Sequence, residues 1–196
     1  MAKTSLAPAG TPSALSRIAR LVRHRWVEGR LHQALPPDVL ERITRRVAAS
    51  ERRHTGQIRI CAEGGLPTSY LWRGASARER AVTLFGKLRV WDTEHNNGVL
   101  IYLLVAEQAI EIVADRGLAR AVPPETWRTL VVHMGEAFRA GRYEDGLTQA
   151  LAEVSALLVQ HFPADAQAVS STTTDPSAGR GLPDAPVLSG DALLKE

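Results

Sequence analysis

The chain has 196 residues, of which 44% are apolar and 23% charged, so it fits one globular domain with tails and excludes a collagen-like or fully disordered protein. Its net charge is +3, but residues 1–53 hold 11 Lys and Arg against 4 Asp and Glu, whereas residues 54–196 hold 13 against 17. No run of about 18 apolar residues is present, which excludes an integral membrane segment. The single cysteine, Cys61, excludes an internal disulfide, and we expect a reducing, cytoplasmic setting.

Two basic helices are predicted near the start of the chain, after a flexible tail over residues 1–15. Apolar residues at helical spacing indicate the first helix over residues 17–31. Its apolar residues share one stripe and are Ile18, Leu21, Val22 and Trp26. A capping pattern over residues 38–41 predicts the second helix over residues 39–54.

Positive charge is concentrated on these two helices. The arginines of the first are Arg17, Arg20, Arg23, Arg25 and Arg30, and those of the second are Arg42, Arg45, Arg46, Arg52 and Arg53. Such a field attracts an anionic partner, although a solvated helix face is the alternative. Nucleic acid is not indicated, because no RNA-recognition aromatic pattern, zinc-finger spacing or helix-turn-helix accompanies the charge.

The middle of the chain begins with a short strand. Residues 57–63 alternate between apolar and polar side chains, which is typical of a half-buried or edge strand. Residues 64–75 hold three Gly and one Pro, and we expect a loop there. Ser76 and Glu79 form a capping box, which predicts that a helix starts at this point.

The sheet is predicted to centre on residues 99–106, which are almost wholly apolar. Such a run is typical of a strand that is covered on both faces. Glu107 and Gln108 would then turn the chain into a return strand over residues 109–114. Two further helices follow, separated at Gly141.

The order of these elements predicts an α/β fold, a three-layer α/β/α sandwich with a small mixed sheet flanked by helices on both faces. We expect a single domain over residues 16–163. Residues 164–196 lack aromatic residues and are rich in Ser, Thr, Asp, Gly and Pro, so we expect a disordered tail there.

Polar residues gather where the central strand begins and where the return strand ends. They are Asp92, Glu94, Asn96, Asn97 and Asp115. In an antiparallel pair the start of one strand lies beside the end of the next, so the fold would bring these oxygens close enough to be candidate ligands for Ca²⁺ or Mg²⁺. The alternative is that Asn-Asn-Gly is simply a turn and that Asp115 caps a loop. No other cofactor is indicated, and no catalytic residue is assigned.

Four segments of the chain resemble those of the TPM-domain family, in the same order and at similar spacing. Residues 51–60, ERRHTGQIRI, are similar to its E-x-x-T-G-x-Q-I-x-V pattern. Residues 97–104 resemble its D-N-G-V-L-L-L segment, residues 112–118 its I-E-V-G-Y-G-L segment, and residues 138–147 its F-R-x-G-x-Y-x-x-G-L segment.

This resemblance implies an α/β/α sandwich of a family named for a thylakoid lumen protein, a photosystem II repair protein and a nematode receptor modulator. Some members are described as acid phosphatases, some bind Ca²⁺, and others are accessory modules of membrane proteins. The chain resembles a soluble bacterial version without a signal peptide or membrane anchor.

Departures from the family pattern fall on the candidate metal site. The Asp of the family's D-N-G is Asn96 here, which removes a negative charge. The Gly and the aromatic residue of its G-Y-G-L are Asp115 and Arg116, and Asp115 would replace the lost charge.

Two hypotheses about function follow. We favour a non-catalytic interaction module, accessory to a membrane-associated protein or complex, whose partner-binding residues are Arg17, Arg20, Arg23 and Arg25. The alternative is a phosphatase that uses Ca²⁺ or Mg²⁺ to act on phosphomonoesters.

Overall fold

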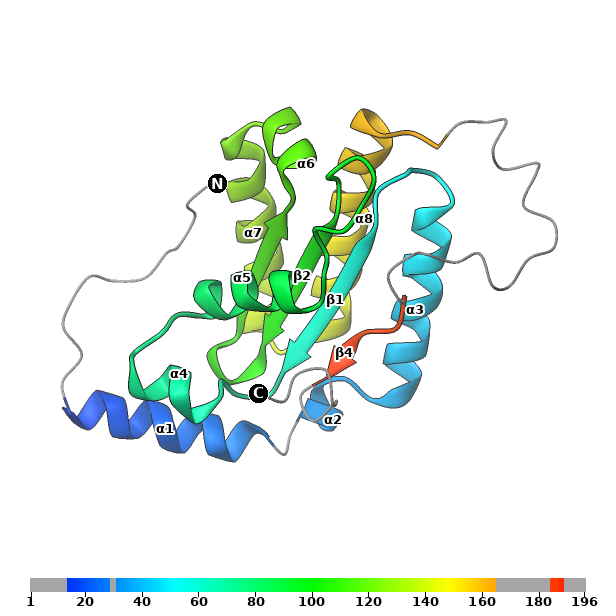
Figure 1. Ribbon diagram of the computed structural model, residues 1–196. Helices are drawn as coiled ribbons and strands as arrows, with labels where there is room; N and C mark the ends of the chain where they lie inside the picture. Colours follow the sequence, from blue (N-terminus) through cyan, green and yellow to red (C-terminus); the bar gives the residue numbers. More distant parts are fainter. Residues whose placement is uncertain (1–13, 29–30, 165–183, 189–196) are drawn as a thin grey trace.

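The computed structural model describes residues 14–28, 31–164 and 184–188, which form a four-stranded sheet with helices on both faces (Figure 1). The strands are β1 (Ile58–Glu63), β2 (Val99–Leu104), β3 (Ala109–Ala114) and β4 (Val187–Leu188), in the spatial order β3-β2-β1-β4. β1 pairs in parallel with β2 and β4, whereas β2 and β3 are antiparallel. The predicted small mixed sheet is therefore confirmed.

β2 is the central strand because all six of its residues are apolar and none has exposed surface. Val99, Ile101 and Leu103 contribute to one core cluster, and Leu100, Tyr102 and Leu104 contribute to the other. This alternation follows from the two-residue period of a strand. It shows that each face of the sheet carries a hydrophobic layer of its own.

Three long helices, α3 (Pro37–Glu51), α7 (Pro124–Arg139) and α8 (Tyr143–His161), cover the first face of the sheet (Figure 1). α3 begins at Pro37, because Pro suits the first position of a helix, and not at the capping pattern of residues 38–41. The short α2 (Leu31–Ala34) leads into it.

Two shorter helices, α4 (Thr68–Trp72) and α5 (Ala77–Lys87), cover the second face. The capping box of α5 is confirmed, since Glu79 N donates to Ser76 Oγ at 3.2 Å and Ser76 N donates to Glu79 Oε2 at 3.0 Å. α4 lies in the segment that was expected to be a loop. The two layers of helices complete the predicted α/β/α sandwich.

β1 is fully buried, and the expectation of a half-buried or edge strand is wrong. Its outer edge is covered by β4, which lies in the segment that was predicted to be disordered. Its charged residue Glu63 is buried because the Arg80 guanidinium of α5 holds both carboxylate oxygens, at 2.7 and 3.0 Å. The Tyr102 hydroxyl donates to the same carboxylate at 2.7 Å.

α1 (Ala14–Glu28) lies outside both layers, beside α4 and the 3-10 turn η1 (Val105–Glu107) that follows β2 (Figure 1). This turn replaces the predicted two-residue turn, and Gln108 completes it with a positive φ of 47°. The remaining helix, α6 (Arg116–Ala121), follows β3 directly.

Candidate functional site

Asn97 and Asp115 lie at the same end of the sheet, as the sequence predicts. Asp115 N donates to Gly98 O at 2.9 Å, which extends the pairing of β2 and β3 by one residue beyond Val99 and Ala114. Asn97 precedes Gly98, so the two residues lie at the same end of the β2–β3 pair, just beyond the strands.

The backbone at this end is tightly fitted. Asn96 adopts a left-handed φ of 51°, which Asn tolerates better than most residues. A Cβ at Gly98 would lie 1.9 Å from Val90 O, and one at Gly117 would lie 2.6 Å from Asn96 O. The Asn-Asn-Gly segment is thus a turn, and its close packing fixes where Asn97 points.

Two buried side-chain oxygens at this end have no hydrogen-bond partner among the described residues. They are Oδ1 of Asn97, a residue with 0% exposure, and Oδ2 of Asp115, a residue with 5% exposure. The other atoms of these groups are engaged: Asn97 Nδ2 donates to Thr55 Oγ1 at 3.2 Å, and Asp115 Oδ1 accepts from Arg116 N at 2.6 Å. Asp115 therefore caps α6 with one oxygen and leaves the other available to a cation or a water molecule.

The other three predicted ligands, Asp92, Glu94 and Asn96, are placed less favourably for binding a cation. The side chains of Asp92 and Glu94 are exposed on the loop before β2. Asn96 Oδ1 accepts from the Arg116 guanidinium at 3.2 Å, which opposes a cation at that atom. Within the described ranges, no group of three or more His, Cys, Asp and Glu residues is arranged to hold a metal. The remaining candidate ligands are thus Asn97 Oδ1 and Asp115 Oδ2. An ion bound to either oxygen would need water molecules to complete its coordination, and Mg²⁺ retains bound water more readily than Ca²⁺ does.

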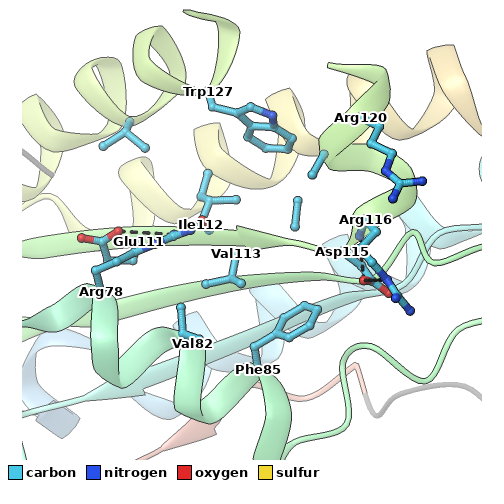
Figure 2. A pocket seen from close by; sticks show the side chains of 13 residues that line it. Arg78, Val82, Phe85, Glu111, Ile112, Val113, Asp115, Arg116, Arg120 and Trp127 are labelled. Atoms are coloured by element: carbon cyan, nitrogen blue, oxygen red, sulfur yellow. Dashed lines mark hydrogen bonds and ion pairs between the residues drawn. The ribbon is translucent and has the colours of Figure 1, made fainter. Parts of the chain in front are cut away.

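A pocket of about 310 Å³ begins at Asp115 and runs along β3. Figure 2 shows Asp115, Arg116 and Arg120 at one end of it, and Arg78 with Glu111 at the other. Its apolar walls come from α5, α7 and the strand itself, and they include Val82, Phe85, Val113, Trp127 and Val131. The pocket thus combines apolar walls with cationic side chains next to the candidate metal site.

Glu111 is the titratable group at the far end of this pocket. Burial raises the pKa of its carboxyl to about 7, although the Arg78 guanidinium, 3.6 Å away, acts in the opposite direction. Arg78 also donates to the carbonyl oxygen of Ile112 on the outer edge of β3. Near neutral pH Glu111 is therefore only partly ionised, and together with Arg78 this end of the pocket carries a partial positive charge.

The predicted partner-binding arginines lie on α1 but differ in their surroundings. Arg20 is bound within the chain, since its guanidinium donates to Glu107 Oε1 and to Ala75 O, both at 2.7 Å. Arg23 and Arg25 are exposed. Arg17 belongs to α1, but its side chain lies outside the described residues.

The predicted apolar stripe of α1 is not part of the core. Only Leu21 packs against a core cluster, whereas Ile18, Val22 and Trp26 are 58%, 56% and 72% exposed. The inner side of the helix is held instead by His24, which is 1% exposed and accepts from Leu66 N at 2.9 Å. We call the exposed residues Ile18, Val22, Arg23, Arg25 and Trp26 the outer face of α1.

Several residues around these sites were not singled out from the sequence. Thr55 holds the amide of Asn97, and Glu107 holds α1 through Arg20 and His24. Trp127 has a helical spacing that indicates the core, and it is indeed only 7% exposed while also lining the pocket. No local pattern marks these roles, because each depends on contacts between segments far apart in the chain.

Comparison with known proteins identifies the fold. A family model described as TPM domain matches residues 31–157. The NMR structure of the BA42 protein from the psychrophilic bacterium Bizionia argentinensis is similar, with a TM-score of 0.60 over 79% of this chain and 94% of that chain. The two sequences are 22% identical, so this likeness shows the fold alone. No curated protein matches the sequence, and none of the described helices is long and apolar enough to cross a bilayer.

Proposed function

Since this chain belongs to the TPM-domain family, we propose that it is a non-catalytic interaction module that attaches to an anionic membrane surface, as an accessory to a membrane-associated protein or complex. The observation that carries this proposal is the outer face of α1, where three large apolar side chains are exposed beside two arginines. Arg23 and Arg25 are retained as partner-binding residues, and Arg20 is assigned to anchoring α1.

The outer face has the geometry of an interfacial helix. Ile18, Val22 and Trp26 are spaced by four residues, so they form a continuous ridge along α1. At 100° per residue, Arg23 and Arg25 fall on opposite sides of this ridge. A ridge of aliphatic and indole side chains between two cations suits the boundary between lipid headgroups and acyl chains.

The inner side of α1 keeps the ridge turned outward. Glu107 Oε1 accepts from Arg20 at 2.7 Å and contacts His24 Nε2 at 3.1 Å. Burial alone would raise the pKa of Glu107, but its hydrogen bonds with His24 and Arg20 outweigh burial, and its pKa lies below the ordinary value. An ionised Glu107 thus fixes the polar side of the helix to the domain, and the apolar side remains exposed.

The charge of the chain favours an anionic surface over a neutral one. Residues 1–53 carry a net charge of +7 from 11 basic and 4 acidic residues, whereas residues 54–196 are net acidic. Each Arg close to a membrane with anionic lipids contributes about 1 kcal/mol of binding free energy. Binding through Arg23 and Arg25 should therefore weaken as salt screens the surface.

Sedimentation with lipid vesicles tests this proposal. The full chain should sediment with phosphatidylcholine vesicles that contain about 30% phosphatidylglycerol, and much less with phosphatidylcholine alone. Reversing both charges in Arg23→Glu/Arg25→Glu should lower vesicle affinity by about tenfold or more, because two attractions become repulsions.

A matched double variant controls for net charge. Arg45 and Arg128 are 69% and 54% exposed on α3 and α7, so Arg45→Glu/Arg128→Glu changes the net charge equally without touching α1. This control should retain most of the binding. Equal loss in both double variants, or no binding by the original chain, would overturn the assignment of α1 as the attachment helix.

A second function, that of a metal-dependent phosphatase, is favoured by the buried, unpartnered oxygen of Asp115, a residue that lines the pocket, and by that of Asn97 at the same end of the sheet. A divalent cation bound there would polarise a phosphoryl oxygen. Arg116 and Arg120, at the same end of the pocket, would bind the other phosphate oxygens. Hydrolysis of p-nitrophenyl phosphate that depends on added Mg²⁺ or Ca²⁺, and that is lost in Asp115→Asn, would support this function in place of the non-catalytic one.

We place the protein in the cytoplasm as part of the same proposal. Its support is the single cysteine of the chain, Cys61, which cannot form an internal disulfide and therefore suits a reducing compartment.

A further inference from the structure

The outer edge of β3 forms the floor of a groove between two helices. Six consecutive residues, Glu111 to Arg116, line the pocket, and β3 is the terminal strand of the described sheet. One wall comes from Val82 and Phe85 of α5, and the opposite wall comes from Trp127 of α7 (Figure 2). Val131, also on α7, lines the same pocket. The groove thus follows the strand and is bounded on both sides by apolar side chains.

The backbone of β3 presents hydrogen-bonding groups to this groove. Asp115 N donates to Gly98 O, and in an antiparallel ladder successive residues point their peptide groups alternately toward and away from the partner strand. Ile112 and Ala114 therefore point theirs away from β2. The hydrogen bond of the Ile112 carbonyl is consistent with this direction, since this oxygen accepts from the Arg78 side chain and not from a neighbouring strand.

We propose that this groove binds an extended peptide of a partner protein, which adds to the sheet as a further strand against β3. Apolar side chains at alternate positions of the peptide would enter the groove, and an acidic group would lie at the end formed by Arg116 and Arg120. The site is separate from the outer face of α1 and goes beyond the proposed function.

Charge complementarity decides what kind of peptide fits. Arg116 and Arg120 are exposed at one end of the groove. At the other end, Arg78 and Glu111 form an ion pair of 3.6 Å. At the first end the two exposed arginines outweigh the one buried carboxylate of Asp115, and at the second end Glu111 faces a single arginine. The stronger positive charge at the first end suits a peptide with one acidic end and an apolar middle.

The two sides of the sheet differ in whether another segment of the chain pairs with the outermost long strand. The chain covers the edge at β1 itself, because Val187 and Leu188 pair there in parallel with Cys61 and Ala62. Within the described ranges, no segment pairs with the outer edge of β3; only Arg78 shields one carbonyl. A bound peptide would displace the Arg78 side chain from the carbonyl of Ile112. Arg78 would still keep its ion-pair partner, because it also pairs with Glu111.

Selection from a phage library of random short peptides on the full chain tests the proposal. Selected peptides should share apolar residues at alternate positions and an Asp or Glu at one end. In fluorescence polarisation, Val82→Asp and Arg120→Glu should each weaken a labelled selected peptide by about tenfold. The matched controls Val132→Asp and Arg128→Glu should stay within about twofold, because both residues are exposed on α7 outside the pocket.

N-methylation of the selected peptide distinguishes strand addition from other binding modes. Methyl groups on alternate peptide nitrogens should abolish binding, and those on the intervening nitrogens should not, because only one set faces β3. Tolerance at every nitrogen, equal affinity for Val82→Asp, or failure to select any peptide that binds the original chain would overturn the proposal. A dimer that light scattering detects in the original chain but not in Val82→Asp would also overturn the proposal, since the groove would then hold a second copy of this chain. The variant Arg23→Glu/Arg25→Glu should keep peptide binding, so failure at α1 and failure at the groove are separable.

Discussion

Asn97 and Asp115 lie just beyond the ends of the adjacent strands β2 and β3, and each holds a buried oxygen that no described group satisfies. Leaving a buried acceptor unsatisfied costs about 1 to 3 kcal/mol, more for a charged group. A cation or an ordered water molecule at either oxygen would remove this cost.

A thermal melt with added cations tests this site. After chelation, millimolar Mg²⁺, Ca²⁺ or Mn²⁺ should raise the Tm by several degrees, since a ligand at about 100 times its Kd adds roughly 2.7 kcal/mol. Asp115→Asn should abolish the shift, because it removes the carboxylate charge while Asn still caps α6. If no cation moves the Tm of the original chain, water completes the two oxygens and the metal site is ruled out.

The buried ion pair of Glu63 and Arg80 should be a large determinant of stability. Their side chains are 3% and 1% exposed. Arg80→Met should therefore lower the free energy of unfolding by about 3 to 5 kcal/mol, because it leaves a carboxylate buried without its partner. Urea denaturation measures this change, and Arg45→Met on an exposed pair should cost less than about 1 kcal/mol.

The double variant Glu63→Gln/Arg80→Met separates loss of charge pairing from loss of packing. It should recover part of the stability lost in Arg80→Met, since no charge then remains buried. A double variant that is less stable than Arg80→Met would show that the carboxylate stabilises the fold through Tyr102 alone.

Glu111 should make stability fall as the pH rises. Burial raises the pKa of its carboxyl to about 7, above the ordinary value of 4.5, so between these two values the folded chain binds more protons than the unfolded chain. The contribution of Glu111, roughly 3 kcal/mol, is fully present below pH 4.5 and is lost as the pH rises through about 7. Comparing unfolding of the original chain and Glu111→Gln across this range isolates the effect, and parallel pH profiles would contradict it.

Glu107 should control how firmly α1 is attached. Glu107→Ala removes the acceptor of Arg20 and the partner of His24. Amide hydrogens of α1 should then exchange about tenfold faster or more, while those of β2 keep their protection. Glu94→Ala, an exposed acidic residue elsewhere, is the matched control. Unchanged protection of α1 in Glu107→Ala would show that Leu21 and His24 suffice to hold the helix.

The sequence predicts the sheet well because its signals are local. The apolar run around β2 indicates a strand buried on both faces, and the return strand brings Asp115 beside the Asn-Asn-Gly turn. β4 could not be predicted in this way, because two residues in a polar segment show no periodicity. Val187 and Leu188 are a strand because they pair with the edge of β1.

The orientation of α1 could not be predicted for a different reason. Its apolar stripe indicates an amphipathic helix but does not say which side meets the domain. That choice depends on Arg20 reaching Glu107 and on His24 reaching Leu66, contacts between segments 87 and 42 residues apart. A polar inner side therefore leaves Ile18, Val22 and Trp26 exposed.

Fluorescence quenching at Trp26 measures whether α1 enters a lipid bilayer. Brominated phosphatidylglycerol in the vesicles quenches a tryptophan that reaches the acyl chains, and Trp26 is the indole on the outer face of α1, with 72% exposure. We expect quenching of the full chain that falls sharply in Trp26→Phe, a variant that keeps Arg23 and Arg25 and still sediments with the vesicles. Undiminished quenching in Trp26→Phe, or no quenching of the original chain, would rule out attachment through α1.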